Sequence, residues 1–461
     1  MMVDGLTWFV LGYFIVMNFG YLTLNVLSLF ALHRNNQEQA LYNMPQAYAG
    51  LEPAVSLLIP AYNEESSIVA SVRSMLQLSY PDYELIVIND GSKDRTLQTL
   101  IQEFSLSPFP ETFRGHIPTQ RINAVYRSSK IRNLRVIDKK NGGKADSLNA
   151  GINLAHHPLF CGVDADSILE RDSLDRVVQP FLRSPEMVAT GGTVRVANGC
   201  HITNGTLNSV GLPDSLLAKF QIVEYLRAFL FGRLGWSRWN ALLIVSGAFG
   251  LFRTDTVLSV GGYKTKTIGE DMELVVRLHH ELSKRGEPYR IEYVPEPVCW
   301  TEAPEDINTL KNQRIRWQRG LCESLCSHWG LMFSRTGGAA GWLAFPFMLL
   351  FEMLSPLLEA FGYLFMVTAI LAGWISWPMF ASFMLVSVGL GILLSVSGLL
   401  LEEMSFHLYP KGSQLATLGL MVVAENFGYR QLNTWWRLQG LYRWATQGEG
   451  QWGVMKRKGI G

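Results

Sequence analysis

The chain has 461 residues, of which 48% are hydrophobic and only 17% are charged, with a formal net charge of +1. This length suffices for one large or two medium domains, and the balanced charge argues against nucleic acid as a partner. The hydrophobic excess is high for a soluble protein and is concentrated at the two ends of the chain. The five cysteines lack paired metal-ligand spacing, which indicates free thiols in a reducing compartment.

The first apolar stretch, Leu6 to Leu32, exceeds the length of about 20 residues that a membrane-spanning helix needs. A signal peptide is the alternative, but Asp4 and no basic residue precedes the stretch, and no cleavage site of small residues follows it. His33-Arg34 comes next, and the positive-inside rule assigns that side to the cytoplasm. We therefore expect residues 1–34 to form a transmembrane anchor and the next domain to be cytoplasmic.

Residues 35–335 are predicted to form that cytoplasmic domain. Short apolar runs predict four buried strands, at 55–59, 84–88, 134–137 and 159–163. Helical periodicity predicts helices between and after them, at 66–78, 94–104, 145–155 and 272–282. Strands and helices that alternate at this spacing are typical of a parallel sheet with helices on both faces. Residues 105–133 show no clear period and are predicted to be a loop or an insertion.

Residues 336–429 are predicted to form a second transmembrane region. Trp377 to Leu401 and Met353 to Trp374 are each long enough to span a bilayer. The segment from Ala339 to Leu350 is too short to span alone, so it is expected to be interfacial or bent. Leu415 to Tyr429 is a weaker candidate because it contains two polar residues, Glu425 and Asn426.

Residues 430–461 are predicted to be an amphipathic, basic segment on the cytoplasmic side, which requires an even number of crossings after the catalytic domain. The stretches 220–239 and 429–452 interleave aromatic residues with arginine. Such faces lie in the headgroup plane of a bilayer, although ordinary packing against the domain is the alternative for both.

Polar clusters follow three of the predicted strands, where ligands bind to parallel sheets. They are Tyr62-Asn63-Glu64, Asn89-Asp90-Gly91-Ser92 and Asp164-Ala165-Asp166. One such cluster alone is weak evidence, since Asn-Asp-Gly-Ser is also a common turn, but three at successive strand ends favour a nucleotide site.

Within these clusters, Asp90 is a candidate to hydrogen-bond a base or a ribose. Asp166 is predicted to be the metal ligand, with Asp164 as its partner on the nucleotide side. Two carboxylates together with diphosphate oxygens suit Mg²⁺ or Mn²⁺. Lys144 follows two glycines at a predicted helix N-terminus, where it can offset diphosphate charge; a capped connection between strand and helix is the alternative.

Six motifs in this order resemble family 2 glycosyltransferases, in particular the processive membrane branch of hyaluronan, chitin, cellulose and poly-N-acetylglucosamine synthases. They are Pro60-Ala-Tyr-Asn-Glu-Glu65, Asn89-Asp-Gly-Ser-Lys-Asp94, Gly142-Gly-Lys-Ala-Asp-Ser-Leu-Asn149, Asp164-Ala-Asp166, Gly269-Glu-Asp271 and Gln313-Arg-Ile-Arg-Trp317. The resemblance covers residues 53 to about 330. It implies an α/β fold of the Rossmann-like GT-A type, flanked by transmembrane helices and interfacial amphipathic helices. It also implies a UDP-sugar donor, a divalent metal and inversion at the anomeric carbon.

The resemblance also implies roles for individual residues. Nucleotide and donor contacts fall on Asn63, Glu64, Asp90, Lys144, Asp164, Gln313 and Arg316, and the metal on Asp166 with Asp164. Asp271 matches the general base, with Glu270 beside it as a second catalytic residue. Trp317, Ser246 and Gly247 are expected to contact the acceptor. The family often has Thr where this chain has Gly269, which leaves local positioning open.

The chemistry is coherent with these roles. Inverting transfer needs one base, here Asp271, to take the acceptor's proton, and UDP leaves as an anion that a metal and Lys144 can stabilise. Alternatives remain for each residue. Asp271 can be a helix N-terminal acid, Trp317 a helix anchor at the membrane, and the segment from Ser246 to Phe252 a core strand instead of a sugar-binding floor.

We therefore expect an inner-membrane, multi-pass synthase that polymerises a β-linked polysaccharide and threads it across the bilayer, with possible accessory membrane or export proteins. The donor is expected to be UDP-N-acetylglucosamine on resemblance only. The alternatives are a non-processive family 2 enzyme that adds one sugar to a lipid acceptor, and a membrane scaffold without activity.

Overall fold

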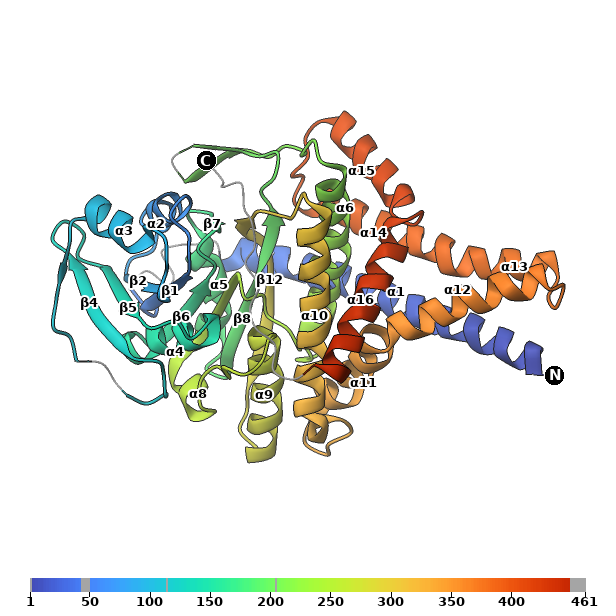
Figure 1. The fold of residues 1–461 in the computed structure, drawn as a ribbon, viewed down its shortest axis with the longest axis horizontal. Coiled ribbons are helices and arrows are strands. Elements are labelled where there is room, and N and C mark those ends of the chain that lie inside the picture. The colour runs from blue at the N-terminus through green and yellow to red at the C-terminus, as the bar shows by residue number, and fades with distance from the viewer. Residues whose placement is uncertain (1, 43–49, 113–114, 204, 448–461) are drawn as a thin grey trace.

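The computed structural model describes residues 2–42, 50–112, 115–203 and 205–447. A sheet flanked by helices forms one end of the molecule, and long apolar helices project from the other end (Figure 1). A layer of helices that includes α6, Leu216–Glu224, and α10, Ile307–Ser327, lies between these two parts. The described part of the chain therefore has an α/β layer and a region of projecting helices, with a layer of helices between them.

The main sheet has ten strands in the order β3-β4-β5-β2-β1-β6-β11-β8-β12-β7. Their bounds are β1 Val55–Ala61, β2 Tyr83–Asn89, β3 Leu106–Pro108, β4 Ile122–Ser128, β5 Leu134–Lys139, β6 Leu159–Val163, β7 Ile168–Leu169, β8 Met187–Val196, β11 Phe249–Arg253 and β12 Arg290–Thr301. A separate hairpin pairs β9, His201–Thr203, with β10, Thr206–Ser209. The four strands predicted from apolar runs are confirmed as β1, β2, β5 and β6, which are mutually parallel.

Alternate residues of the central strands supply two separate cores. Leu58 of β1 belongs to the core on the α4 face, and its neighbour Leu57 belongs to the core against α2 and α3. The helices are α2 Ile68–Met75, α3 Thr96–Phe104, α4 Lys144–Leu154 and, beside β8 and β12, α5 Ser173–Arg183. Burial on both faces explains why these strands read as continuous apolar runs.

Two expectations about the sheet are wrong. Residues 105–133 include strands β3 and β4, which pair antiparallel and extend the edge beyond β5. Most of β4 is only partly buried, so its sequence lacks the apolar signal of a strand, and pairing with β5 decides its structure. The sheet is also mixed, because β11 runs antiparallel to both β6 and β8.

The helical layer continues from α6 through a π-helix, η2, Tyr225–Gly232, into α7, Arg233–Ser237. Helices α8 Thr254–Ser259 and α9 Glu270–Arg285 lie on the sheet side, and α16, Tyr429–Thr446, runs beside α10. A 3₁₀ turn, η3, Trp329–Leu331, follows α10. In the stretch 220–239, Leu226, Leu230 and Phe231 are buried within the protein, so this stretch packs internally, while Trp239 stays 41% exposed.

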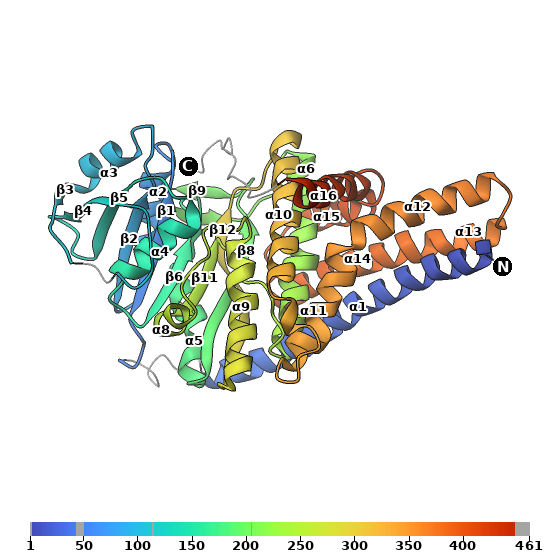
Figure 2. The same ribbon diagram turned by 60° about the horizontal axis from the view of Figure 1, so that its bottom comes forward.

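Two of the described helices are long and apolar enough to cross a membrane, Met2–Leu32 within α1 (Met2–Tyr42) and Trp377–Ser405. The latter comprises α13 Trp377–Met384, η6 Leu385–Gly389 and α14 Leu390–Ser405. The predicted span from Met353 begins at Ser355 as α12, Ser355–Leu371. The helical segment before it, Ala340–Met353, is bent by 48° from α12. This segment comprises η4 Ala340–Ala344, α11 Phe345–Met348 and η5 Leu349–Met353. Of the two predictions for the segment 339–350, interfacial or bent, the structure shows the bent form. Helix α15, Gly412–Ala424, is shorter, and α1, α12, α13 and α14 project together (Figure 2).

Candidate active site

One cavity of about 1210 Å³ contains every residue that the sequence predicted for the site. Its wall includes Asn63, Glu64, Asp90, Lys144, Asp164, Asp166, Ser246, Gly247, Glu270, Asp271, Gln313, Arg316 and Trp317. The first six of these lie at the carboxyl ends of β1, β2 and β6 or at the start of α4, and the others come from the β11, α9 and α10 regions. The structure therefore brings all of them together, while their individual roles stay predictions.

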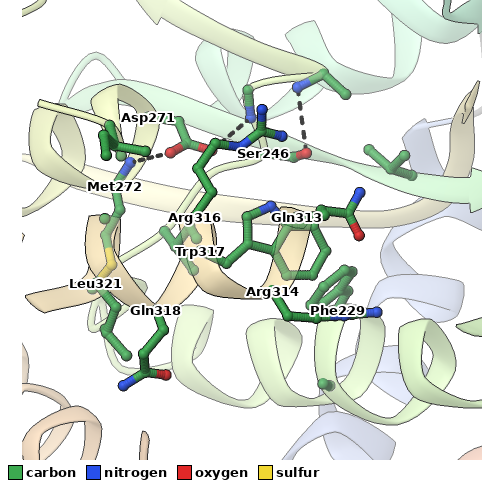
Figure 3. A pocket seen from close by; sticks show the side chains of 18 of the residues that line it. Phe229, Ser246, Asp271, Met272, Gln313, Arg314, Arg316, Trp317, Gln318 and Leu321 are labelled. Atoms are coloured by element: carbon green, nitrogen blue, oxygen red, sulfur yellow. Dashed lines mark hydrogen bonds between the residues drawn. The ribbon is translucent and has the colours of Figure 1, made fainter. Parts of the chain in front are cut away.

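Asp271 lies in the first turn of α9, and backbone N–H groups hold both of its carboxylate oxygens. Its Oδ2 accepts a hydrogen bond from the Gly247 N–H at 3.0 Å and its Oδ1 accepts one from the Met272 N–H at 2.8 Å (Figure 3). These two donors fix the orientation of the carboxylate group. Asp271 is thus an acid at a helix N-terminus that also lines the cavity, and its role as a base stays a prediction.

Gly269 has a packing reason to lack a side chain. A Cβ placed there would lie 2.8 Å from the Cα of Gly320 on α10, because the two backbones touch at this point. The threonine that is common in the resembling family would not fit this contact. The close approach brings the N-terminus of α9 against the helix that carries Trp317.

Glu270 and Lys144 form a buried charged group beside Asp271. The Lys144 ammonium lies 2.5 Å from Asp164 Oδ1 and 3.6 Å from Glu270 Oε1, and it donates to the Gly247 carbonyl at 3.0 Å. Burial disfavours charge on Lys144, but Asp164 and Glu270 outweigh it and raise the pKa of this ammonium. Burial raises the pKa of Glu270 to about 7, against the opposing attraction of Lys144. Glu270 therefore changes charge near neutral pH.

The Asp90 carboxylate is hydrogen-bonded by the loop 141–143 and paired with a lysine, and the sequence did not indicate either contact. Its oxygens accept hydrogen bonds from the Gly142 N–H at 2.9 Å, the Gly143 N–H at 2.7 Å and Asn141 Nδ2 at 3.1 Å. The fully buried ammonium of Lys139 pairs with Asp90 as well. Asp90 thus holds the glycine loop that precedes Lys144 in place through hydrogen bonds. Its contact with a nucleotide stays a prediction.

Asp164 and Asp166 fit a divalent cation that is shared with a bound diphosphate. Both follow β6 and line the cavity, and the side chain of Asp164 is 29% exposed. Among the described residues, no group of three or more His, Cys, Asp or Glu could hold a metal by itself. Mg²⁺ is commonly held by one or two carboxylates together with substrate phosphates, so this donor set suits Mg²⁺ or Mn²⁺ in the presence of the nucleotide.

Three residues of α10 face the cavity because their spacing puts them on one side of the helix: Gln313, Arg316 and Trp317. The Arg314 guanidinium lies 4.4 Å from the centre of the Trp317 ring, and the Phe229 ring lies 5.5 Å from it. Figure 3 shows these side chains together on one wall. Phe229 and Arg314 were not predicted from the sequence, because nothing in the sequence places η2 against α10.

Ser246 and Gly247 lie just before β11, with Ala248 between them and the strand. The core-strand alternative is confirmed for Phe249 to Phe252, while the two earlier residues line the cavity and their contact with a sugar stays a prediction. A Cβ on Gly247 would lie 2.9 Å from Lys144 Nζ, so glycine permits the approach of Lys144 and Asp271 to this backbone.

The cavity also extends between the projecting helices, which the sequence did not predict. Its wall there includes aromatic, hydroxyl and charged side chains, among them Tyr21, Glu352, Glu359, Tyr363, Ser387, Arg430 and Arg437. The two parts belong to one continuous cavity. Acidic side chains line the part at the sheet edge, and charged and aromatic side chains line the part between the helices. A long, polar ligand could therefore contact both parts.

Comparison with known proteins gives two matching family models. Residues 160–395 match the model described as "Glycosyl transferase family group 2", and residues 56–114 match "Glycosyl transferase family 2". The chain is 29% identical over 272 residues to the poly-beta-1,6-N-acetyl-D-glucosamine synthase of Staphylococcus epidermidis, and 30% identical over 274 residues to the synthase of the same name in Staphylococcus aureus (strain COL). Each match covers 59% of this chain and 55% of the relative, so the chain spans about half the length of these curated relatives.

Among solved structures, the fold is similar to that of the mannosyltransferase PcManGT from Pyrobaculum calidifontis, described in complex with GDP-Man and Mn²⁺. The TM-score is 0.52 at 16% identity, over 88% of this chain and 99% of that chain. At this identity the likeness concerns the fold alone, and it confirms the predicted α/β fold of the GT-A type.

Proposed function

The chain belongs to glycosyl transferase family group 2, and from this premise we propose that it extends a β-linked polysaccharide by repeated sugar transfer from a UDP-sugar. The observation that carries the proposal is the single cavity that collects Asp164, Asp166, Asp271 and Trp317. UDP-N-acetylglucosamine is the proposed donor, which the likeness to two staphylococcal synthases named for this sugar supports.

Asp271 is the proposed base of an inverting displacement. An acceptor hydroxyl oxygen attacks the anomeric carbon, the bond from that carbon to the UDP oxygen breaks, and Asp271 takes the hydroxyl proton. UDP departs as an anion, so no second carboxyl group is needed as an acid. The Gly247 and Met272 N–H groups orient the Asp271 carboxylate for this step.

The donor side of the proposed site has three components. Asp164 and Asp166 would hold Mg²⁺ or Mn²⁺, which when bound offsets the charge that develops on the leaving diphosphate. Lys144 adds a cation next to Asp164. Asn63, Glu64 and Asp90 lie where the nucleoside would bind, and Gln313 and Arg316 lie on the facing helix.

The acceptor side is proposed to run from Trp317, Ser246 and Gly247 into the part of the cavity between the projecting helices. Aromatic rings suit the apolar face of a sugar, and hydroxyl and charged groups suit its hydroxyls. This lining supports the proposal that the growing polymer is threaded outward across a membrane. The helices that are long and apolar enough to cross a membrane support membrane association. We propose a multi-pass chain in the inner membrane, with residues 35–335 in the cytoplasm. Accessory export proteins are proposed as partners.

The test uses the purified full chain in lipid nanodiscs with Mn²⁺ and a panel of UDP-sugars. UDP release from UDP-N-acetylglucosamine and a ladder of long products in mass spectrometry are expected. Products with one added sugar would replace the processive proposal with the lipid-acceptor alternative. Absence of UDP release with every sugar of the panel would contradict the proposed activity altogether.

Metal dependence is tested in the same assay. Excess chelator should abolish turnover, and Asp166→Ala should weaken metal-dependent UDP binding, because one of two protein ligands is lost. Undiminished turnover in chelator would show that the two carboxylates do not hold a required ion.

A further inference from the structure

Three polar side chains from distant parts of the chain meet next to Trp317. Glu224 ends α6, Arg314 precedes Trp317 by one helical turn on α10, and Tyr429 begins α16. Arg314 donates to the two oxygens of Glu224 at 2.8 and 2.9 Å, and the Tyr429 hydroxyl donates to Glu224 Oε2 at 2.9 Å. All three residues are at most 9% exposed. A bidentate pair of this kind holds the plane of a guanidinium in one orientation.

The oriented guanidinium is the group that contacts the Trp317 ring. Arg314 lies 4.4 Å from the ring centre, and Phe229 lies 5.5 Å from it, so the ring is held by neighbours on α10 and η2 (Figure 3). Phe220 stacks on the Tyr429 ring at 4.9 Å and fixes that residue in turn. Glu224, Arg314, Phe229 and Trp317 all line the cavity.

From this geometry we propose that Glu224 and Tyr429 are positioning residues of the acceptor site: they orient Arg314, and Arg314 orients the Trp317 ring on which the acceptor sugar stacks. The inference rests on the acceptor role proposed for Trp317. Because Tyr429 belongs to α16, this C-terminal helix sets the geometry of a residue in the predicted catalytic domain. Stability alone gives little reason for such a pair, since apolar packing often replaces a buried ion pair without loss.

The direct test is Tyr429→Phe in the full chain, which removes one hydroxyl group. The KM for an oligosaccharide acceptor should rise about tenfold, as expected for a hydrogen bond to a charged group. The KM for UDP-N-acetylglucosamine and the rate of sugar transfer to water should stay unchanged, because neither involves the acceptor. An unchanged acceptor KM, or a rise in the donor KM alone, would overturn the inference.

Tyr80→Phe is the matched control. Tyr80 and Tyr429 are both 6% exposed, and the Tyr80 hydroxyl also donates a hydrogen bond, to the Pro53 carbonyl at 2.6 Å. Neither tyrosine lines the cavity, so the two differ in the partner of the hydroxyl group, which is Glu224 only for Tyr429. The control should lose a similar amount of stability without a change in either KM.

A double-mutant cycle then separates positioning from general structural support. In a Trp317→Ala background, Tyr429→Phe should change the acceptor KM less than about twofold, because the ring that it orients is gone. If the two effects multiply, the network does not act through Trp317 and the inference is wrong.

Arg314→Lys is the second variant if Tyr429→Phe does not fold. It keeps the positive charge but loses the bidentate fork and the flat contact with the ring. A wild-type acceptor KM in this variant would also overturn the inference. Failure of the wild-type chain to transfer any sugar would instead contradict the proposed function.

Discussion

At the scale of single residues, Glu270 and Asp271 show how two adjacent carboxyl groups acquire different properties. Asp271 accepts hydrogen bonds from two backbone N–H groups. Glu270 is 5% exposed and lies 3.6 Å from the Lys144 ammonium, which also pairs with Asp164. Different environments of neighbouring carboxyl groups commonly divide acid–base roles between them. We therefore expect the two residues to respond differently to substitution.

Asp271→Asn should preserve the fold and UDP binding while transfer falls by about 10² to 10⁴-fold, the usual effect of losing a general base. The amide can still accept at its oxygen but cannot take the proton. UDP affinity by calorimetry and UDP release by a coupled assay measure the two effects separately. Turnover like that of the wild type would exclude Asp271 as the base.

Glu270→Gln should change how stability depends on pH. The pKa of Glu270 is raised to about 7 from 4.5, so the folded chain keeps a proton that the unfolded chain releases between these values. Stability contributed by this group is present below pH 4.5 and is lost as pH rises through 7. The loss should be on the order of 1–3 kcal/mol.

The measurement is Tm between pH 4 and 8 without donor or metal. Wild-type Tm should decline over this window more than that of Glu270→Gln, whose side chain does not ionise. Glu103→Gln, which removes a surface carboxylate with 36% exposure on α3, is the control and should follow the wild type. Parallel curves for all three proteins would contradict the raised pKa.

At the scale of elements, the contact between α9 and α10 fixes the distance between the proposed base and the proposed acceptor residue. Gly269 and Gly320 let the two backbones approach, and Ser324 Oγ donates to the Gly269 carbonyl at 3.5 Å. Glu323 of α10 accepts hydrogen bonds from the Ile268 N–H and the Thr267 hydroxyl. Together these contacts tie the start of α9 to α10 directly beside Asp271.

Gly269→Thr should destabilise the protein by about 1–3 kcal/mol, which is typical of an oversized side chain in a packed contact. It should also lower kcat, because α9 and α10 must move apart. Thermal unfolding and steady-state kinetics test both effects. Gly115→Thr is the control, since a Cβ on Gly115 meets nothing within 4 Å. Normal stability and kcat in Gly269→Thr would show that the contact between Gly269 and Gly320 accommodates a side chain without loss of stability or activity.

At the scale of the whole molecule, buried ion pairs connect the sheet and its helical layer to the projecting helices. Arg195 of β8 pairs with Glu402 of α14, and Arg227 of η2 pairs with Glu425, which also pairs with Arg430. Glu425 is fully buried between these partners. Glu425, one of the two polar residues that made the segment 415–429 a weak membrane candidate, thus has its Oε1 paired with two arginines inside the protein.

The C-terminus is predicted to be cytoplasmic. The prediction needs two crossings after residue 335, which the bent pair 340–371, taken as one span, and the helix Trp377–Ser405 would supply. Helix α15 has 13 residues, or roughly 20 Å at 1.5 Å per residue, which is too short for a bilayer core of about 30 Å. A reporter fused after Gly461 should be active only if it functions in the cytoplasm. Activity restricted to the outside would require a third crossing.

The sequence by itself determined the parts of this protein that depend on local pattern. Apolar runs located β1, β2, β5 and β6, and polar clusters directly after three of these strands identified residues that line the cavity, because neighbouring parallel strands end at the same edge. Hydropathy located the long apolar helices, since length and composition alone determine whether a helix can span a membrane.

Tertiary structure alone decided the features that depend on contacts between distant segments. Strand β4 exists because β5 offers a partner, and Gly269 is explained only by Gly320, 51 positions later in the chain. Lys139 and the group of Glu224, Arg314 and Tyr429 carry no local signal, because a buried charge looks like a surface charge until its partner is placed beside it. The extension of the cavity between the helices follows from the packing of α1, α12 and α16.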